Sequence, residues 1–254
     1  MLLSIQAHLI YTCAQPCDLL LQIEVAQDPE QRLEEMQFRI SPDIETNIVR
    51  GEEQVGIRRW LRVADAFECL YQTKVVVDRQ SVELADLKTT PLNQIPSEVT
   101  KFLMPSRYCH PEDFLNSVPA LFGPHSGGQL IAVMSKWIRN EFTYDNLVSN
   151  GMTTATDSFG ARAGVCRDYA HVLIAMARAV GIPARFVSAY APNVTPQDFH
   201  AVAEVYLEGK WHLVDPTGMA KASGIARIGV GRDAADVSFM TSYGSMSLKK
   251  QAVN

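Results

Sequence analysis

The sequence predicts an α+β protein in which an antiparallel β domain precedes a domain that mixes helices and strands. Short segments with alternating apolar and polar residues, separated by turn signals, fill the beginning of the chain. Prolines then interrupt the pattern, and beyond them two segments with helical periodicity are followed by a strand and a hairpin. These observations divide the chain into residues 1–90, a proline-rich connection at 91–125, and a second domain at 126–254.

The first domain contains six predicted strands, because apolar residues recur at every second position. Turn residues such as Pro16 and the Ser41-Pro42-Asp43 run separate them. The segments are 3–11, 19–25, 36–40, 44–49, 56–63 and 67–77.

The connection from 91 to 125 carries six prolines and little periodicity. We expect it to pack against both domains, with short helices near Glu98 and Asp113. Its prolines are Pro91, Pro96, Pro105, Pro111, Pro119 and Pro124.

Two helices are predicted in the second domain. Residues 128–142 carry an apolar stripe that includes Met134 and Trp137. Residues 166–179 are apolar on several sides, which predicts a central, buried helix, and Gly181 with Pro183 ends it. The strand 184–190 follows.

Composition excludes several classes of function. The formal charge of −5 and the lack of a basic stripe argue against nucleic-acid binding. No apolar run is long enough to cross a bilayer, so we expect no membrane partner. The first residues do not resemble a signal peptide, and five cysteines form no disulfide framework. We therefore expect a cytoplasmic protein.

Cys166 is the candidate nucleophile. Gly164 lets the backbone turn sharply before the helix, and a cysteine in the first helical turn faces unpaired N–H groups and the positive end of the helix dipole. Both favour the nucleophilic thiolate. The alternative is a small apolar core residue, which is the usual role of a free cysteine.

His200 and Asp215 are the candidate base and orienting carboxylate. If residues 208–209 form a two-residue hairpin loop, Val202 lies opposite Asp215 and His200 is its diagonal neighbour on the same face. A loop at 209–210 preserves the shared face, whereas a loop with an odd number of residues separates the two side chains. Taken singly, an aspartate before proline is often a turn former, and a histidine that opens a strand is often solvated.

The two nearby histidines do not fit. His212 falls on the opposite face of the hairpin from Asp215, and His171 lies about 140° around the helix from Cys166. His200 would accept the thiol proton, and Asp215 would hold the other ring nitrogen. The backbone N–H of Cys166 is placed to stabilise an oxyanion. Tyr144 or an N–H before the helix would be the second donor.

Four segments resemble the transglutaminase-like superfamily, and most closely its bacterial branch of candidate cysteine proteases with an N-terminal β domain. They are Gly-Val-Cys-Arg-Asp-Tyr-Ala-His at 164–171, Arg-Ala-Val-Gly-Ile-Pro-Ala-Arg at 178–185, His-Ala at 200–201 and Trp-His-Leu-Val-Asp-Pro-Thr at 211–217. The resemblance covers about residues 128–217, and residues 229–237 look like the tail of the same branch. Val202 departs from the pattern, because relatives commonly carry tryptophan there.

The resemblance implies a papain-like core in which a cysteine-bearing helix packs on an antiparallel sheet that supplies histidine and aspartate. It implies a Cys166–His200–Asp215 triad and places Asp233 at the border of a cleft. We therefore expect Tyr144, Tyr190 and Asp233 to contact the substrate.

The function expected is acyl transfer from a peptide or amide through a thioester, ending in hydrolysis because water is always available. The partner would be a peptide or protein substrate, and we expect no cofactor or metal. Transfer to an amine, as in a transglutaminase, and a non-catalytic binding module on the same fold are the alternatives. A structural metal site at Cys109, His110 and His125 is disfavoured, since adjacent ligands rarely bind one ion.

Overall fold

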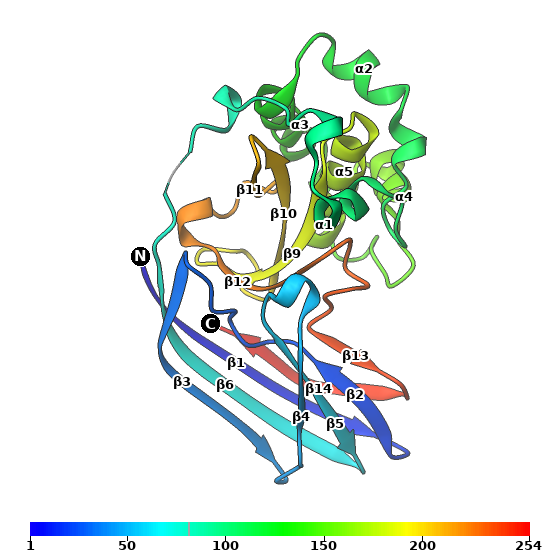
Figure 1. Ribbon diagram of the computed structural model, residues 1–254. Coiled ribbons are helices and arrows are strands. Elements are labelled where there is room, and N and C mark those ends of the chain that lie inside the picture. The colour runs from blue at the N-terminus through cyan, green and yellow to red at the C-terminus, as the bar shows by residue number, and fades with distance from the viewer. Residues whose placement is uncertain (81) are drawn as a thin grey trace.

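The computed structural model describes residues 1–80 and 82–254 and shows two lobes (Figure 1). One lobe holds two antiparallel sheets, and the other holds a third antiparallel sheet with the longer helices. This arrangement confirms the predicted α+β class.

The first lobe is built from two four-stranded sheets that pack face to face. One sheet has the order β14-β1-β6-β3, and the other has the order β13-β2-β5-β4. Alternate side chains along β1 and β6 are buried, and they meet those of β2 and β5 in one apolar core. The strands are β1 (Leu2–Cys13), β2 (Cys17–Leu21), β3 (Gln31–Ser41), β4 (Asn47–Arg50), β5 (Ile57–Val63), β6 (Ala66–Val77), β13 (Met240–Ser242) and β14 (Met246–Val253).

The last two strands differ from the predicted division of the chain. We assigned all of residues 126–254 to the second domain, but β14 pairs with β1, and β13 pairs with β2. The chain therefore returns to the first lobe after completing the second (Figure 1). This pairing joins residues more than 200 positions apart, and local periodicity carries no information about such partners.

The second lobe surrounds an antiparallel sheet with the order β11-β10-β9-β12. Helix α5 (Cys166–Ala179) packs on β9 and β10, and α3 (Gly127–Glu141) and α4 (Ala155–Ala161) pack on α5. The strands are β9 (Ala184–Tyr190), β10 (His200–Leu207), β11 (Lys210–Val214) and β12 (Ala226–Gly231). Every residue of β10 is buried, because the sheet is covered on both faces.

The connecting segment contains short helical turns, including the two that we predicted near Glu98 and Asp113. Its α-helices are α1 (Ser97–Thr100) and α2 (Ser117–Phe122).

The remaining short elements are spread over the whole chain. Strand β7 (Thr143–Tyr144) pairs in parallel with β8 (Ala163–Gly164). The 3-10 turns are Glu52–Gln54, Leu84–Asp86, Leu92–Gln94, Lys101–Leu103, Pro111–Phe114 and Ala222–Gly224.

A buried ionic network joins the two lobes behind the sheet. Glu204 of β10 is fully buried and accepts hydrogen bonds from Arg185 and Arg227, each at 2.7 Å. Arg227 also pairs with Asp28 at 2.8 Å and Glu30 at 2.9 Å, both in the first lobe. Burial alone would raise the pKa of Glu204, but the two guanidinium groups outweigh it and hold the pKa below its ordinary value.

Candidate active site

Cys166 is the first residue of α5, as the sequence predicted, and its helix ends at Ala179. The start of the helix is set by Asp168, whose carboxylate accepts the backbone N–H of Val165 at 2.8 Å. This carboxylate is fully buried. Because the Val165 N–H is bound to this carboxylate, it is not free to stabilise an oxyanion. It was one of the backbone N–H groups before the helix that we considered as the second oxyanion donor.

Gly164 makes this start possible. Its φ is +157°, and a Cβ placed there would lie 2.6 Å from the Cβ of Asp168 and 2.7 Å from its Oδ2. No real Cβ tolerates such contacts, so any side chain at this position would push the Asp168 carboxylate away from the Val165 N–H.

Gly164→Ala should therefore lower the free energy of unfolding by about 1–3 kcal/mol, because a helix cap is lost and the backbone is strained. Urea denaturation measures the change. Gly160→Ala on α4 is the matched control, since a Cβ there meets nothing within 4 Å, and we expect it to be neutral or slightly stabilising. Equal effects of the two substitutions would contradict this account of Gly164.

The β10–β11 hairpin has the register that places His200 and Asp215 on one face. Leu207 pairs with Lys210 and Ala203 with Val214, so the loop is the two-residue turn at 208–209. Glu208 and Gly209 both have positive φ, at 49° and 77°, as a type I′ turn requires. The structure thus confirms the two-residue hairpin loop that we predicted at residues 208–209.

His200 and Asp215 are in direct contact. The Nε2 atom of His200 lies 2.9 Å from Oδ2 of Asp215, and both side chains are almost completely buried. Asp215 also accepts the N–H and the hydroxyl of Thr217 at 2.9 and 2.7 Å, and the N–H of Ala220 at 2.8 Å. Both oxygens of the carboxylate therefore accept hydrogen bonds that fix its position. The carboxylate in turn fixes the orientation of the His200 ring.

Cys166 and His200 line the same cleft. Burial alone would lower the pKa of His200, but the hydrogen bond to Asp215 and the nearby Cys166 raise it to about 9. Burial would likewise raise the pKa of Asp215, and its bond to His200 holds it below the ordinary value. An imidazolium between a carboxylate and a thiol is the arrangement that activates a cysteine nucleophile.

The raised pKa of His200 predicts a pH dependence. The stability that the protonated ring contributes is complete below about pH 6.5, the ordinary histidine value, and is lost as the pH rises through about 9. An NMR titration of the His200 ring should show a midpoint near 9, and Cys166→Ala should lower it. A midpoint below 6.5 in the wild-type protein would contradict the assignment.

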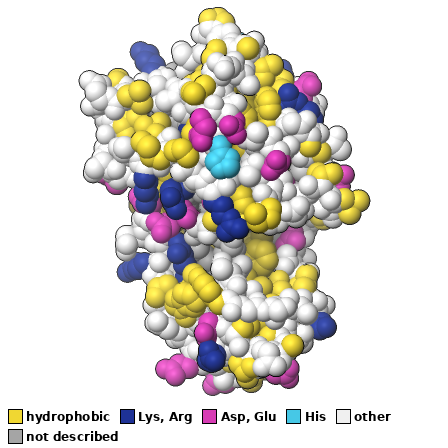
Figure 2. Space-filling view, turned by 90° about the vertical axis from the view of Figure 1, so that its right-hand side faces the viewer, with side chains coloured by type: hydrophobic (Ala, Val, Ile, Leu, Met, Phe, Trp, Pro, Cys, Tyr) yellow, Lys and Arg dark blue, Asp and Glu magenta, His cyan; other side chains and the backbone are white. Residues whose placement is uncertain are grey.

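Cys166 and His200 line a cleft of about 620 Å³ between the lobes. Tyr144 of β7, Phe239 just before β13 and Met240 at the start of β13 also line it. Figure 2 shows one face of the molecule, which narrows between the two lobes, with hydrophobic side chains at this level. The cleft is therefore bounded by both lobes.

Part of the chain matches a known protein family, and the whole chain superposes on a solved structure. Residues 124–216 match the family model described as the transglutaminase-like superfamily. A crystal structure from Cytophaga hutchinsonii, described as a candidate cysteine protease, superposes with a TM-score of 0.93 at 29% identity, over 100% of this chain and 89% of the other. The chain carries a transglutaminase-like domain.

The chain is also similar to more distant proteins. An uncharacterized protein of Mycobacterium leprae is 25% identical over 175 residues, which are 65% of this chain. The match spans 56% of the length of that curated relative. The periplasmic domain of TgpA from Pseudomonas aeruginosa is 18% identical with a TM-score of 0.44, over 84% of this chain and 76% of the other, which is too distant to support an argument.

Tyr144 is the predicted substrate contact that lies in the cleft of the transglutaminase-like domain. Burial raises the pKa of its phenol, and the neighbouring Cys166 adds to the rise. Tyr144 and Cys166 both line this cleft. Its use as an oxyanion donor stays a prediction.

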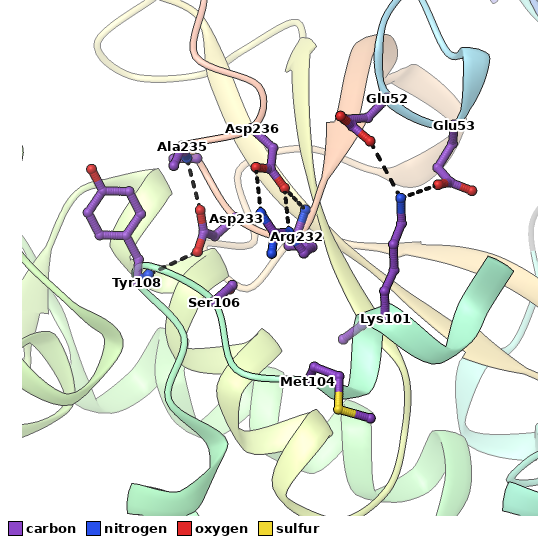
Figure 3. A network of polar contacts seen from close by, with 12 residues as sticks. Glu52, Glu53, Lys101, Met104, Ser106, Tyr108, Arg232, Asp233, Ala235 and Asp236 are labelled. Carbon is purple, nitrogen blue, oxygen red and sulfur yellow. Dashed lines mark hydrogen bonds and ion pairs between the residues drawn. The ribbon is translucent and has the colours of Figure 1, made fainter. Parts of the chain in front are cut away.

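Tyr190 and Asp233 do not line the cleft, in contrast to our expectation. Tyr190 is buried between the lobes, where its hydroxyl donates to the backbone oxygen of Ile23 at 2.7 Å. Asp233 is buried and accepts the backbone N–H groups of Tyr108 and Ala235 (Figure 3). The aspartate therefore holds two loops together beside the site, and we no longer propose either residue as a substrate contact.

The other histidines have structural positions. His171 is fully buried in the domain, stacks on Tyr108 with ring centroids 5.0 Å apart, and accepts the N–H of Ala234. Burial holds its pKa well below the ordinary value. His212 contacts the backbone oxygen of Leu207. Neither bonds to Asp215 or lines the cleft.

The described residues contain no cluster of three potential metal ligands. Cys109 is buried, and its thiol donates to the backbone oxygen of His171. No described helix is long and apolar enough to span a membrane.

Proposed function

We propose that this protein is a cysteine-dependent acyl-transfer enzyme that hydrolyses peptide or amide bonds. The observation that carries the proposal is the position of His200, which lies 2.9 Å from Asp215 and lines the same cleft as Cys166 at the start of α5. The similar structure from Cytophaga hutchinsonii, described as a candidate cysteine protease, supports it.

In the proposed reaction the sulfur of Cys166 attacks the carbonyl carbon of the substrate. The thiol proton resides on His200 and passes to the leaving amine as the carbon–nitrogen bond breaks, which leaves a thioester. Water then attacks the thioester and gives a proton to His200, and the carbon–sulfur bond breaks, which releases the carboxylic acid and restores the thiolate of Cys166 beside the protonated His200. Asp215 keeps the ring oriented and stabilises its charged form throughout.

Alkylation of Cys166 by iodoacetamide tests the proposed pair. We expect wild-type Cys166 to react at lower pH than Cys166 in His200→Ala, because the imidazolium stabilises the thiolate. His212→Ala is the matched control, since this histidine lies on the same hairpin but does not contact Asp215. A labelling midpoint near pH 8.5 that His200→Ala leaves unmoved would contradict the proposal and favour a binding module on the same fold.

The fate of the acyl group needs a second measurement. A library of peptide amides, incubated with the wild-type protein and with Cys166→Ala, should give carboxylic acids only in the presence of Cys166. Added primary amine should leave hydrolysis as the main outcome. If the added amine instead replaces the leaving group in most of the peptide amides that react, the protein is a transglutaminase. The cytoplasmic location stays a prediction.

A further inference from the structure

The cleft beside Cys166 has two chemically different walls. One wall comes from the helical side and presents polar and charged groups, among them Asp145, Asn146 and Arg167. The other wall includes the apolar side chains of Phe199, Phe239 and Met240. Phe199, His200 and Cys166 all line this cleft, so the apolar surface and the candidate catalytic residues share one site.

The apolar wall is held rigidly by the first lobe. Phe199 and Phe239 stack with centroids 4.8 Å apart and planes at 11°. Gln22 of the first lobe donates its backbone N–H to the oxygen of Phe239 at 2.8 Å, and Met240 pairs with Leu21 of β2. These contacts fix the backbone, while the side chains of Phe199, Phe239 and Met240 stay half-exposed to the cleft.

The carboxylate next to this wall, that of Asp198, already accepts hydrogen bonds. Asp198 lines the cleft two residues before His200, and both of its oxygens accept hydrogen bonds from Nε2 of Gln251, at 2.8 and 2.9 Å. A cationic side chain would have to compete with this amide. Phe199, Phe239 and Met240 offer a charged or amide side chain no strong hydrogen-bond partner in exchange for the water it loses, whereas an apolar side chain gains by leaving water.

We propose that the cleft selects acyl donors that carry a large apolar side chain next to the reacting carbonyl, and that Phe199, Phe239 and Met240 form the surface that receives this side chain. The inference rests on the proposed function, because it names the substrate class of the same site. It also gives the first lobe a direct part in substrate choice.

Two affinity reagents test the wall without requiring turnover. Tosyl-phenylalanyl and tosyl-lysyl chloromethyl ketones both alkylate a cysteine, as a sulfur–carbon bond forms and chloride leaves, and they differ in the side chain. The rate of modification of Cys166 is measured by mass spectrometry, with iodoacetamide as the reagent without a side chain. We expect the phenylalanyl reagent to react at least about tenfold faster in the wild-type protein, the scale of a pocket contact.

Substitutions locate the preference. Phe239→Ala should reduce the ratio of the two rates at least threefold while the iodoacetamide rate stays unchanged, and Phe239→Leu should retain most of the ratio. Met240→Ala is the second variant, in case Phe239→Ala loses stability. Leu248→Ala is the control, because this leucine is exposed on β14 and does not line the cleft.

A ratio near one in the wild-type protein would overturn the inference. So would variants that slow all three reagents equally, because the wall would then only support the fold. Failure of the proposed function is distinct, since it appears as iodoacetamide labelling that does not depend on His200, and the ratio of the chloromethyl ketone rates still reports on the wall.

Discussion

Asp215→Ala is expected to lower kcat for the best amide substrate by about 10⁴-fold with little change in KM. The carboxylate contacts His200 but does not itself line the cleft, so its loss removes the orientation of the ring and the stabilisation of its charge. Steady-state kinetics measure the effect, and a thermal melt verifies that the variant is folded. Asp18→Ala is the matched control, because its carboxylate forms an exposed ion pair with Arg62 in the first lobe.

Asparagine should not replace Asp215. Both oxygens of this carboxylate accept hydrogen bonds, from Thr217 on one side and from Ala220 and His200 on the other. An amide in either orientation would turn its NH₂ group toward a donor. We therefore expect Asp215→Asn to recover little of the lost activity. Activity of Asp215→Ala close to that of Asp18→Ala would contradict the proposed role.

Glu204→Ala is expected to lower the free energy of unfolding by about 3–5 kcal/mol, because it leaves Arg185 and Arg227 buried without their shared carboxylate. Urea denaturation at neutral pH measures the loss. The pKa of Glu204 is held low in the folded state, so its stabilising effect is present above the ordinary carboxyl range and is lost as the pH falls through the lowered value.

Glu35→Ala provides the comparison. Its carboxylate pairs with Lys74, and both side chains are exposed, so we expect a loss of no more than about 1 kcal/mol. Similar losses in Glu204→Ala and Glu35→Ala would show that the network does not stabilise the junction of the lobes. A loss confined to Glu204→Ala would support a role in holding β10, which begins at His200.

Local patterns predicted most of the elements. Alternation located the strands of the first lobe, with differences at their ends: β2 stops at Leu21 although Ile23 and Val25 are buried, and β4 begins only at Asn47. The helix 166–179 has the predicted bounds. Burial produces the apolar pattern, and a residue can be buried without belonging to a strand, so strand ends are poorly defined by sequence.

Two of the three catalytic candidates, His200 and Asp215, could be paired from the sequence because they lie on one hairpin. His200 and Asp215 are joined by a two-residue turn, so the parity of the hairpin decides which side chains share a face. Tyr190 and Asp233 were wrong as substrate contacts, because their burial depends on packing against Ile23 and Tyr108, which lie far away in the chain. Asp168 was missed, although an acidic residue at the third helical position is a capping signal.

The sequence by itself determined the helix that begins at Cys166, the face shared by His200 and Asp215, and the family resemblance, since these depend on helix and hairpin geometry over a few turns or residues. Only the tertiary structure decided that β13 and β14 return to the first lobe and carry Phe239 and Met240 into the cleft. The physical reason is the distance along the chain. The packing of the whole core selects the pairing of β14 with β1, and a local sequence pattern contains no information about that packing.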